Sequence, residues 1–198
     1  FNIYLIKKMI SKDFKRRRDF LIRKIEDNSI VILFSGLEKS RNNDVNYKFR
    51  QSSNFFYLTG INNPSMLLII TKTGNRHSTT LVCDRPNDID KIWHGQLPSK
   101  SSYKNQFEIQ NVLYFDELKS LELNDAKNIY FEFADENRLN EFISNLNLSQ
   151  PQSRYLRNNT SRSTKIDLSN LIFDMRRIKS KSEVSLIRHA AKISASAH

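Results

Sequence analysis

The sequence is poor in the residues that build disulfides, metal sites and glycine-rich loops. Its 198 residues include one cysteine, four histidines, four glycines and four prolines. The lone Cys83 excludes an intrachain disulfide and gives no sign of an oxidising compartment. The histidines lack ligand spacing, and no phosphate-binding loop, nucleophile elbow or Cys-His pairing signal is present. These absences leave no recognised catalytic constellation within the chain.

Long apolar runs are also lacking. The stretch over residues 1–10 is interrupted by Lys7 and Lys8 and is far shorter than the roughly 20 residues that a membrane span needs. The sequence therefore predicts no span. It begins at Phe1 and stops at His198 inside a helical pattern, so we expect a piece of a longer protein whose presequence, if any, lies upstream.

Acidic residues are in short supply, and the formal net charge is +11. The excess is uneven, because residues 1–50 and 151–198 are basic while the middle of the chain is mildly acidic. A nucleic-acid footprint, a face for an acidic partner, and surfaces covered by a missing remainder are all consistent with this distribution.

Strand-length apolar runs alternate with helical patterns, which predicts an α/β domain with three layers. The length and the 38% hydrophobic content suit one globular domain. Gly74 marks a hairpin turn, so the sheet should be mixed. Expected strands are residues 30–34, 66–71, 79–83, 112–115 and 129–133, and expected helices are residues 11–26, a short one from 87 or 88 to 93, and 135–146.

The domain expectations follow from composition. Residues 11–147 should form the α/β domain, with Arg16, Arg17 and Arg18 mostly on the solvated face of the first helix. Residues 148–166 are rich in Ser, Asn, Gln and Arg and are expected to form a linker. Residues 167–198 should form two helices, the second opened by a capping box of Ser180 and Glu183.

The segment 47–60 places one cation, Arg50, within an aromatic cluster that ends on Gly60. Three successive aromatic residues, 55–57, cannot all face one way on a strand, so the pattern favours a core strand packed on both sides. A guanidinium beside that much apolar surface needs a carboxylate or backbone carbonyls as acceptors. On pattern alone, Arg50 is a structural arginine.

This segment resembles the signature of the N-terminal domain of aminopeptidase P, the family of Xaa-Pro aminopeptidases. The matching residues are Tyr47, Arg50, Gln51, Phe55, Tyr57 and Gly60. Other segments are similar in the same order: 14–18, 30–34, Asp84-Arg85, 92–95 and the run 175–183. The resemblance extends over nearly the whole chain and implies the three-layer α/β fold with a mixed sheet, followed by the first helices of a catalytic domain.

The resemblance implies a parent peptidase that removes an N-terminal residue preceding proline, with two manganese ions as cofactors. The family's metal ligands all belong to its catalytic domain, so we expect none in this chain and no activity from it alone. The implied role here is to narrow the cleft and to assist assembly into a homo-oligomer. The implied partner is a peptide with an N-terminal Xaa-Pro, and neither nucleic acid nor a membrane is expected to bind. The implied location is the mitochondrion or the cytoplasm.

Two residues match family positions near the substrate cleft. Asp44 could pair with an arginine or a substrate amine, although a turn aspartate is an equal alternative. Trp93 suits packing on proline but could equally belong to the core. Residues 96–98 replace an arginine-rich segment of some relatives, so contacts made by those arginines are not expected here.

Two other functions remain open. One is a protein-binding module that has lost catalysis, like the aminopeptidase-like region of the large subunit of the FACT histone chaperone, although a basic chain should repel histones. The other is nucleic-acid binding through the basic ends, which we rank last because the aromatic residues lie in an apolar run rather than an RNP-like arrangement.

Overall fold

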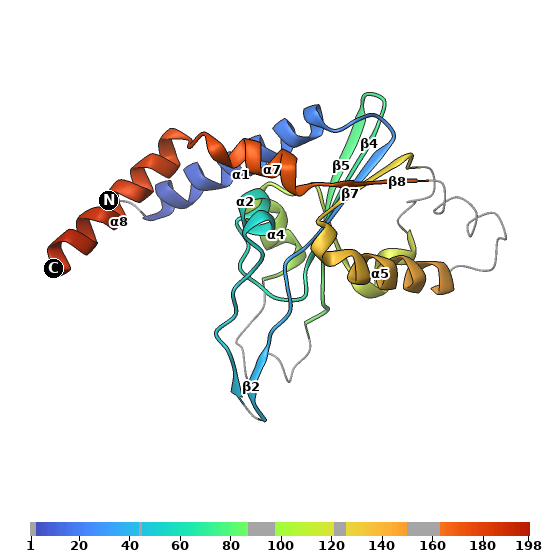
Figure 1. Ribbon diagram of the computed structural model, residues 1–198, viewed down its shortest axis with the longest axis horizontal. Coiled ribbons are helices and arrows are strands. Elements are labelled where there is room, and N and C mark those ends of the chain that lie inside the picture. The colour runs from blue at the N-terminus through green and yellow to red at the C-terminus, as the bar shows by residue number, and fades with distance from the viewer. Residues whose placement is uncertain (1–2, 44, 87–97, 121–125, 150–162) are drawn as a thin grey trace.

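The computed structural model describes residues 3–43, 45–86, 98–120, 126–149 and 163–198 (Figure 1). Its helices are α1 (Ile3–Lys24), α2 (Ser53–Thr59), α4 (Lys100–Phe107), α5 (Glu136–Ser149), α7 (Ser169–Arg177) and α8 (Lys181–Ala197), with 3-10 turns η1 (Phe115–Ser120) and η2 (Phe133–Asp135). Its strands are β1 (Ser29–Phe34), β2 (Ser40–Asn42), β3 (Val45–Asn46), β4 (Leu67–Thr73), β5 (Arg76–Cys83), β6 (Asn111–Tyr114), β7 (Asn128–Phe131) and β8 (Thr164–Asp167).

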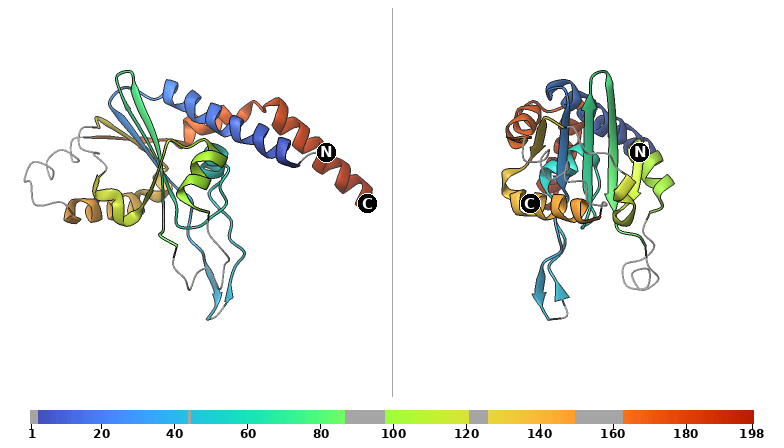
Figure 2. Two further views of the ribbon diagram at one scale, coloured as in Figure 1. Left: turned by 180° about the vertical axis from the view of Figure 1, so that it is seen from behind. Right: turned by 90° about the vertical axis from the view of Figure 1, so that its right-hand side faces the viewer.

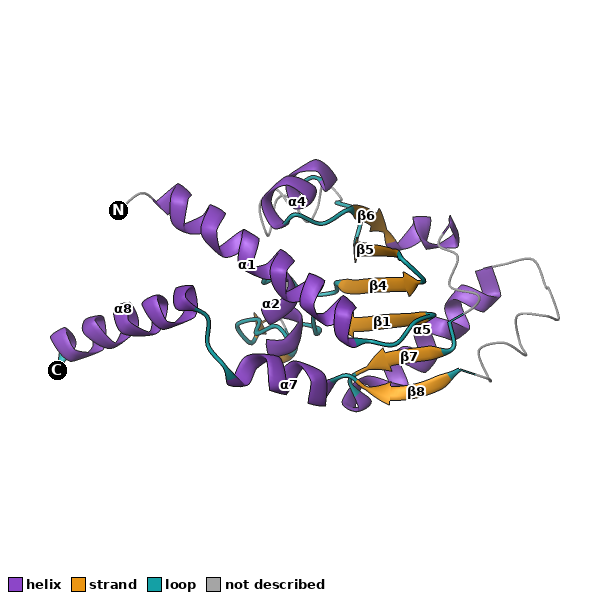
Figure 3. Cartoon of the chain, turned by 90° about the horizontal axis from the view of Figure 1, so that it is seen from above, coloured by secondary structure: helices purple, strands orange, loops and turns teal. Residues whose placement is uncertain are grey.

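The main sheet has the strand order β6-β5-β4-β1-β7-β8, which Figure 3 shows from above. Strand β4 is antiparallel to both β1 and β5, while β6, β7 and β8 pair in parallel with their neighbours. The five strands other than β4 therefore end at one edge of the sheet. The mixed sheet expected from the hairpin at Gly74 is confirmed.

Helices cover both faces of this sheet, which confirms the three-layer α/β architecture (Figure 2). Alternate residues of β1 show why: Val31 and Leu33 pack with α1, α2, α4 and α7, while Ile30, Ile32 and Phe34 pack with α5. Because successive strand residues point to opposite faces, a continuous apolar run is what a strand buried on both sides requires.

Most expected strands lie within one to three residues of their observed bounds. The strand expected to reach residue 133 ends at Phe131, because residues 133–135 form η2. The linker expected over residues 148–166 overlaps a strand at its end, because residues 164–167 form the edge strand β8. Helix α4 and the small β2–β3 hairpin were not predicted. The helix expected up to residue 93 lies outside the described residues.

The segment 55–57 is helical, so the prediction of a core strand was wrong. The side chain of Ser52 caps α2 by accepting a hydrogen bond from the Phe55 backbone N–H at 3.4 Å. Gly60 ends the helix in the left-handed conformation, with φ of 73°, and donates its N–H to the Phe56 carbonyl. Phe55 and Leu58, three residues apart, are fully buried on one helix face. The caps outweigh the strand propensity of three aromatic residues.

Helix α1 begins eight residues before Ser11, and Arg18 does not lie on its solvated face. Its side chain is 2% exposed and donates hydrogen bonds to the carbonyls of Leu58, Phe107 and Glu108, all at 2.8 Å. Arg18 is four residues after the buried Phe14, so the helical period places it on the inner stripe. The expectation that this arginine is solvated was therefore wrong.

Arg18 joins three parts of the chain: α1, the end of α2 and the end of α4. Desolvation lowers the pKa of its guanidinium to about 10, although Asp19 and Glu108 oppose that shift. Arg18 therefore remains a cation at neutral pH. Three carbonyl dipoles that point at the guanidinium stabilise its charge. Within the described part of the chain, Arg18 forms no ion pair with a carboxylate.

Arg18→Met should destabilise the protein by about 3 kcal/mol or more, because buried carbonyls that lose their donor cost about 1–3 kcal/mol each. Urea unfolding followed by circular dichroism measures this change. Arg16→Met is the matched control on the same helix: the Arg16 side chain is exposed, and its pair with Asp13 should contribute less than about 1 kcal/mol. Equal destabilisation by the two variants would contradict the role given to Arg18.

Candidate functional site at the junction with the C-terminal helices

The signature helix α2 lies where α1 meets α7 and α8 (Figure 3). Arg17 organises this junction: it donates to the Tyr57 carbonyl at 3.0 Å, lies 4.1 Å from the centre of the Tyr57 ring and pairs with Glu183 at 3.2 Å. The Arg17 side chain is only 11% exposed, so this pair is better shielded from water than a surface salt bridge. One arginine thus ties α1, α2 and α8 together.

Tyr57 adds a second tie. Its hydroxyl donates to the Met175 carbonyl at 3.1 Å, which satisfies a group near the end of α7. Burial raises the pKa of Tyr57 above its ordinary value, although the positive charge of Arg17 opposes the shift. The hydroxyl therefore stays protonated and able to donate throughout the neutral range.

The start of α8 is fixed by polar contacts. Ser180 and Glu183 form the expected capping box, in which the serine side chain accepts from the Glu183 N–H and the glutamate accepts from the Ser180 N–H at 2.8 Å. Ser182 hydrogen-bonds to Asp13 of α1. Beyond this first turn, α8 has no buried residue, and it exposes Leu186, Ile187 and Ile193.

A polar chain links the sheet to α7. Glu132, just after β7, accepts a hydrogen bond from Asn54 at 2.7 Å and one from Ser52 at 3.3 Å. Asn54 in turn accepts from the Arg176 guanidinium at 2.7 Å. Burial raises the pKa of the Glu132 carboxyl, and its hydrogen bonds from Asn54 and Ser52 act in the opposite direction.

The signature residues divide into two groups. Phe55, Tyr57 and Gly60 belong to the packed junction, whereas Tyr47 is exposed on the hairpin and Arg50 is exposed at its base. Arg50 and Gln51 line two neighbouring grooves, one beside α8 and one beneath the hairpin. The expected acceptor for Arg50 is not present among the described residues, and Arg18 is the arginine that the apolar interior holds.

The two residues expected near a substrate cleft, Asp44 and Trp93, lie outside the described residues. Sequence reasoning missed Arg17, Asn54, Glu132 and Arg176. Arg17 could have been found from its position three residues after Phe14, and Arg176 from its place in the run 175–183. No local signal marks Glu132 or Asn54, because their pairing joins residues far apart in sequence.

Among the residues with described placement, no group of three or more His, Cys, Asp and Glu is arranged to hold a metal ion. The described residues therefore do not fit a metal centre. A search of the same residues for a helix that could cross a membrane finds none.

The fold and junction define an α/β domain whose last helices lead away from it. The family described as "Aminopeptidase P, N-terminal domain" matches residues 14–130, so this chain belongs to that family. The solved structure of aminopeptidase P from E. coli superposes with a TM-score of 0.82 at 24% identity, covering 95% of this chain and 43% of that one.

Among curated proteins, the Xaa-Pro aminopeptidase of Escherichia coli is 27% identical over 190 residues, covering 94% of this chain and 43% of that protein. The mitochondrial intermediate cleaving peptidase 55 of Arabidopsis thaliana is 23% identical over 177 residues, covering 89% and 34%. The chain thus spans less than half the length of these relatives, which are peptidases by name.

Gly60→Ala tests the close approach that ends α2. A Cβ on Gly60 would lie 2.1 Å from an atom of the Phe14 ring, and φ of 73° is itself unfavourable for alanine. Gly74→Ala shares the positive φ, at 58°, but meets no atom within 4 Å. Thermal and urea unfolding should show Gly60→Ala to be less stable than Gly74→Ala by roughly 1–3 kcal/mol. Equal losses would mean that the Phe14 contact relaxes freely.

Glu132→Gln tests the polar chain through its pH dependence. Because the folded-state pKa of Glu132 is raised, its contribution to stability is present below its unfolded pKa and is lost as pH rises through the folded value. The glutamine variant should therefore gain stability relative to wild type as the pH rises above the ordinary pKa of a glutamate carboxyl. Urea unfolding at several pH values measures the difference. Glu141→Gln, at an exposed position, should show no such trend.

Proposed function

We propose that this chain is the N-terminal, non-catalytic part of a Xaa-Pro aminopeptidase, a peptidase that removes an N-terminal residue preceding proline. The observation that carries the proposal is the junction: α7 and α8 are held to the domain by Arg17, Tyr57 and Arg176, yet α8 projects with an uncovered apolar face. A helix anchored at one end and unburied beyond it suits the start of a further domain.

The proposed division follows the expected boundaries, with residues 11–147 as the N-terminal domain, 148–166 as a linker and 167–198 as the connecting helices. The structure departs from these boundaries at one place: β8 (Thr164–Asp167) pairs with β7 and so belongs to the sheet of the first domain rather than to the linker. In this arrangement the junction fixes the angle at which α8 leaves the domain, and so orients whatever follows it.

The finer parts of the proposal concern the longer protein. It should be a two-metal enzyme that uses manganese, acts on peptides with an N-terminal Xaa-Pro, and assembles as a homo-oligomer in mitochondria or cytoplasm. The N-terminal domain should shape access to the cleft, with Asp44 and Trp93 as its cleft residues. Membrane and nucleic acid have no part in this proposal.

The direct test compares this 198-residue chain with its full-length parent on an Xaa-Pro peptide, with and without manganese. We expect the parent to release the first residue and this chain to release none. Activity of the isolated chain would contradict the assignment of catalysis to the rest of the protein. A parent that is folded but inactive with manganese would favour the alternative of a protein-binding module without catalysis.

Arg17→Met in the full-length parent tests the proposed role of the junction. Loss of the Arg17 contacts removes the ion pair with Glu183 and leaves the Ser182–Asp13 hydrogen bond between α8 and α1, so hydrogen exchange in residues 180–198 should become faster. Activity on the Xaa-Pro peptide should fall at the same time. Lys15→Met, which removes only an exposed pair with Asp19, should change neither. Faster exchange with unchanged activity would show that the junction does not govern catalysis.

A further inference from the structure

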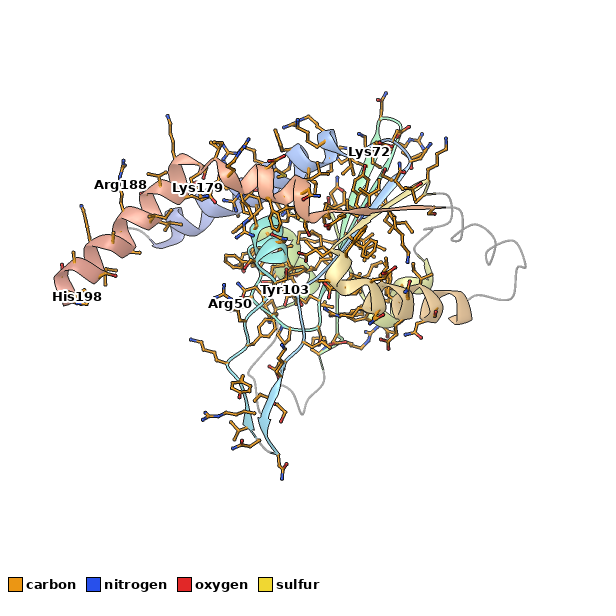
Figure 4. All side chains as sticks on the ribbon, in the orientation of Figure 1. Arg50, Lys72, Tyr103, Lys179, Arg188 and His198 are labelled. Carbon is orange, nitrogen blue, oxygen red and sulfur yellow. The ribbon has the colours of Figure 1, made fainter. Side chains whose placement is uncertain are left out.

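A groove with four cationic side chains lies beneath the hairpin at the carboxyl end of β1. Its volume is about 420 Å³, and Lys39, Lys48, Arg50 and Arg138 line it. Figure 4 labels Arg50 between α2 and the projecting hairpin, with its side chain away from the core. No hydrogen bond or ion pair joins Arg50 to another residue in the described part of the chain, so its guanidinium can contact a ligand in this groove.

Among the described residues, the cations of this groove outnumber the acidic side chains that line it. Asp135 is the one acidic residue in its described lining, and it lies 3.3 Å from Arg138. Within the described part of the chain, Lys39, Lys48 and Arg50 form no ion pair. Three cations converging on one concave surface repel one another, and an anion that enters between them relieves this repulsion.

The position suits a ligand site. Strands β1 and β7 run in parallel, and their carboxyl ends meet beside the groove, the edge at which open α/β sheets commonly bind ligands. Gly36, which lines the groove at φ of 108°, turns the chain out of β1 toward the hairpin. Arg50 follows the hairpin and lines the same groove, so residues on both sides of the hairpin contribute to the site.

The chemistry favours carboxylates over nucleic-acid bases. Two of the three aromatic rings in the described lining lie beside a guanidinium group: Arg138 is 4.4 Å from the centre of the Phe34 ring, and Arg41 is 6.0 Å from that of Tyr47. Rings already paired with guanidinium groups offer poor platforms for stacked bases. A guanidinium flanked by two lysines is instead well suited to a carboxylate, which it can bind through two hydrogen bonds.

We propose that this groove binds the carboxylate groups of an acidic peptide, with Arg50 and Lys48 as the main contacts. In the longer protein this peptide is the part of a substrate that follows the proline, a statement that rests on the proposed function. The groove then favours substrates with Asp or Glu after the proline.

Binding is measured first on this chain, by fluorescence anisotropy with a labelled peptide Ala-Pro-Asp-Glu-Asp-Glu and its neutral counterpart Ala-Pro-Asn-Gln-Asn-Gln. We expect saturable binding of the acidic peptide alone, weakened by added salt. Arg50→Gln and Lys48→Gln should each weaken binding about tenfold, which corresponds to the loss of one charge-assisted hydrogen bond. Both residues are exposed, so both variants should unfold at the wild-type temperature.

Lys127→Gln is the matched control, because it removes the same charge at an exposed residue just before β7, at the opposite end of that strand from the groove. Binding by this variant should equal that of wild type. Equal weakening by Lys127→Gln and Arg50→Gln, or equal binding of the acidic and neutral peptides, would overturn the proposal. Tighter binding of a single-stranded oligonucleotide that Arg50→Gln abolishes would also overturn it.

The substrate part is tested on the full-length parent, where kcat/KM for the acidic peptide should exceed that for the neutral peptide and Arg50→Gln should remove the preference. A parent that cleaves both peptides equally overturns this part while leaving the proposed function intact. A parent that cleaves neither overturns the proposed function, whereas binding to this chain is judged separately by anisotropy.

Discussion

The buried guanidinium of Arg18 is the contact on which the first layer of helices depends. From its position in α1 it donates hydrogen bonds to three main-chain carbonyls at the ends of α2 and α4. Carbonyls at helix ends need donors, and these belong to one buried residue, Leu58, and two half-buried ones, Phe107 and Glu108. A cation inside an apolar layer is costly unless its donors are used, so the same arrangement fixes both α2 and α4 against α1. The position of the signature helix is thus set by a residue outside the signature.

This placement explains why adjacent arginines on α1 have different roles. Arg16 faces water, Arg17 reaches sideways to Tyr57 and Glu183, and Arg18 points inward. Successive residues of a helix are about 100° apart, so three in a row necessarily sample three directions. The inner position organises the domain and the lateral one connects it to α8. One turn of α1 therefore supplies both Arg18, which holds the domain together, and Arg17, which connects the domain to α8.

Sequence reasoning predicted the central sheet well, because continuous apolar runs and a turn at Gly74 are local signals. It failed where local signals conflict with tertiary ones. The aromatic run 55–57 has strand propensity, yet the caps Ser52 and Gly60 make it helical. Arg18 was misplaced because charge was given more weight than its spacing from Phe14. The link from Glu132 to Arg176 through Asn54 joins parts of the chain far apart in sequence, so no short pattern could reveal it.

The edge strand β8 has a mechanical consequence for the molecule. It is four residues long, pairs with β7 alone among the strands that the structure describes, and passes directly into α7, where Leu168 donates its N–H to the Phe131 carbonyl. Short edge strands are among the first parts of a sheet to open. Force transmitted from α8 along the chain through α7 therefore reaches the sheet at a four-residue outer strand rather than at its centre.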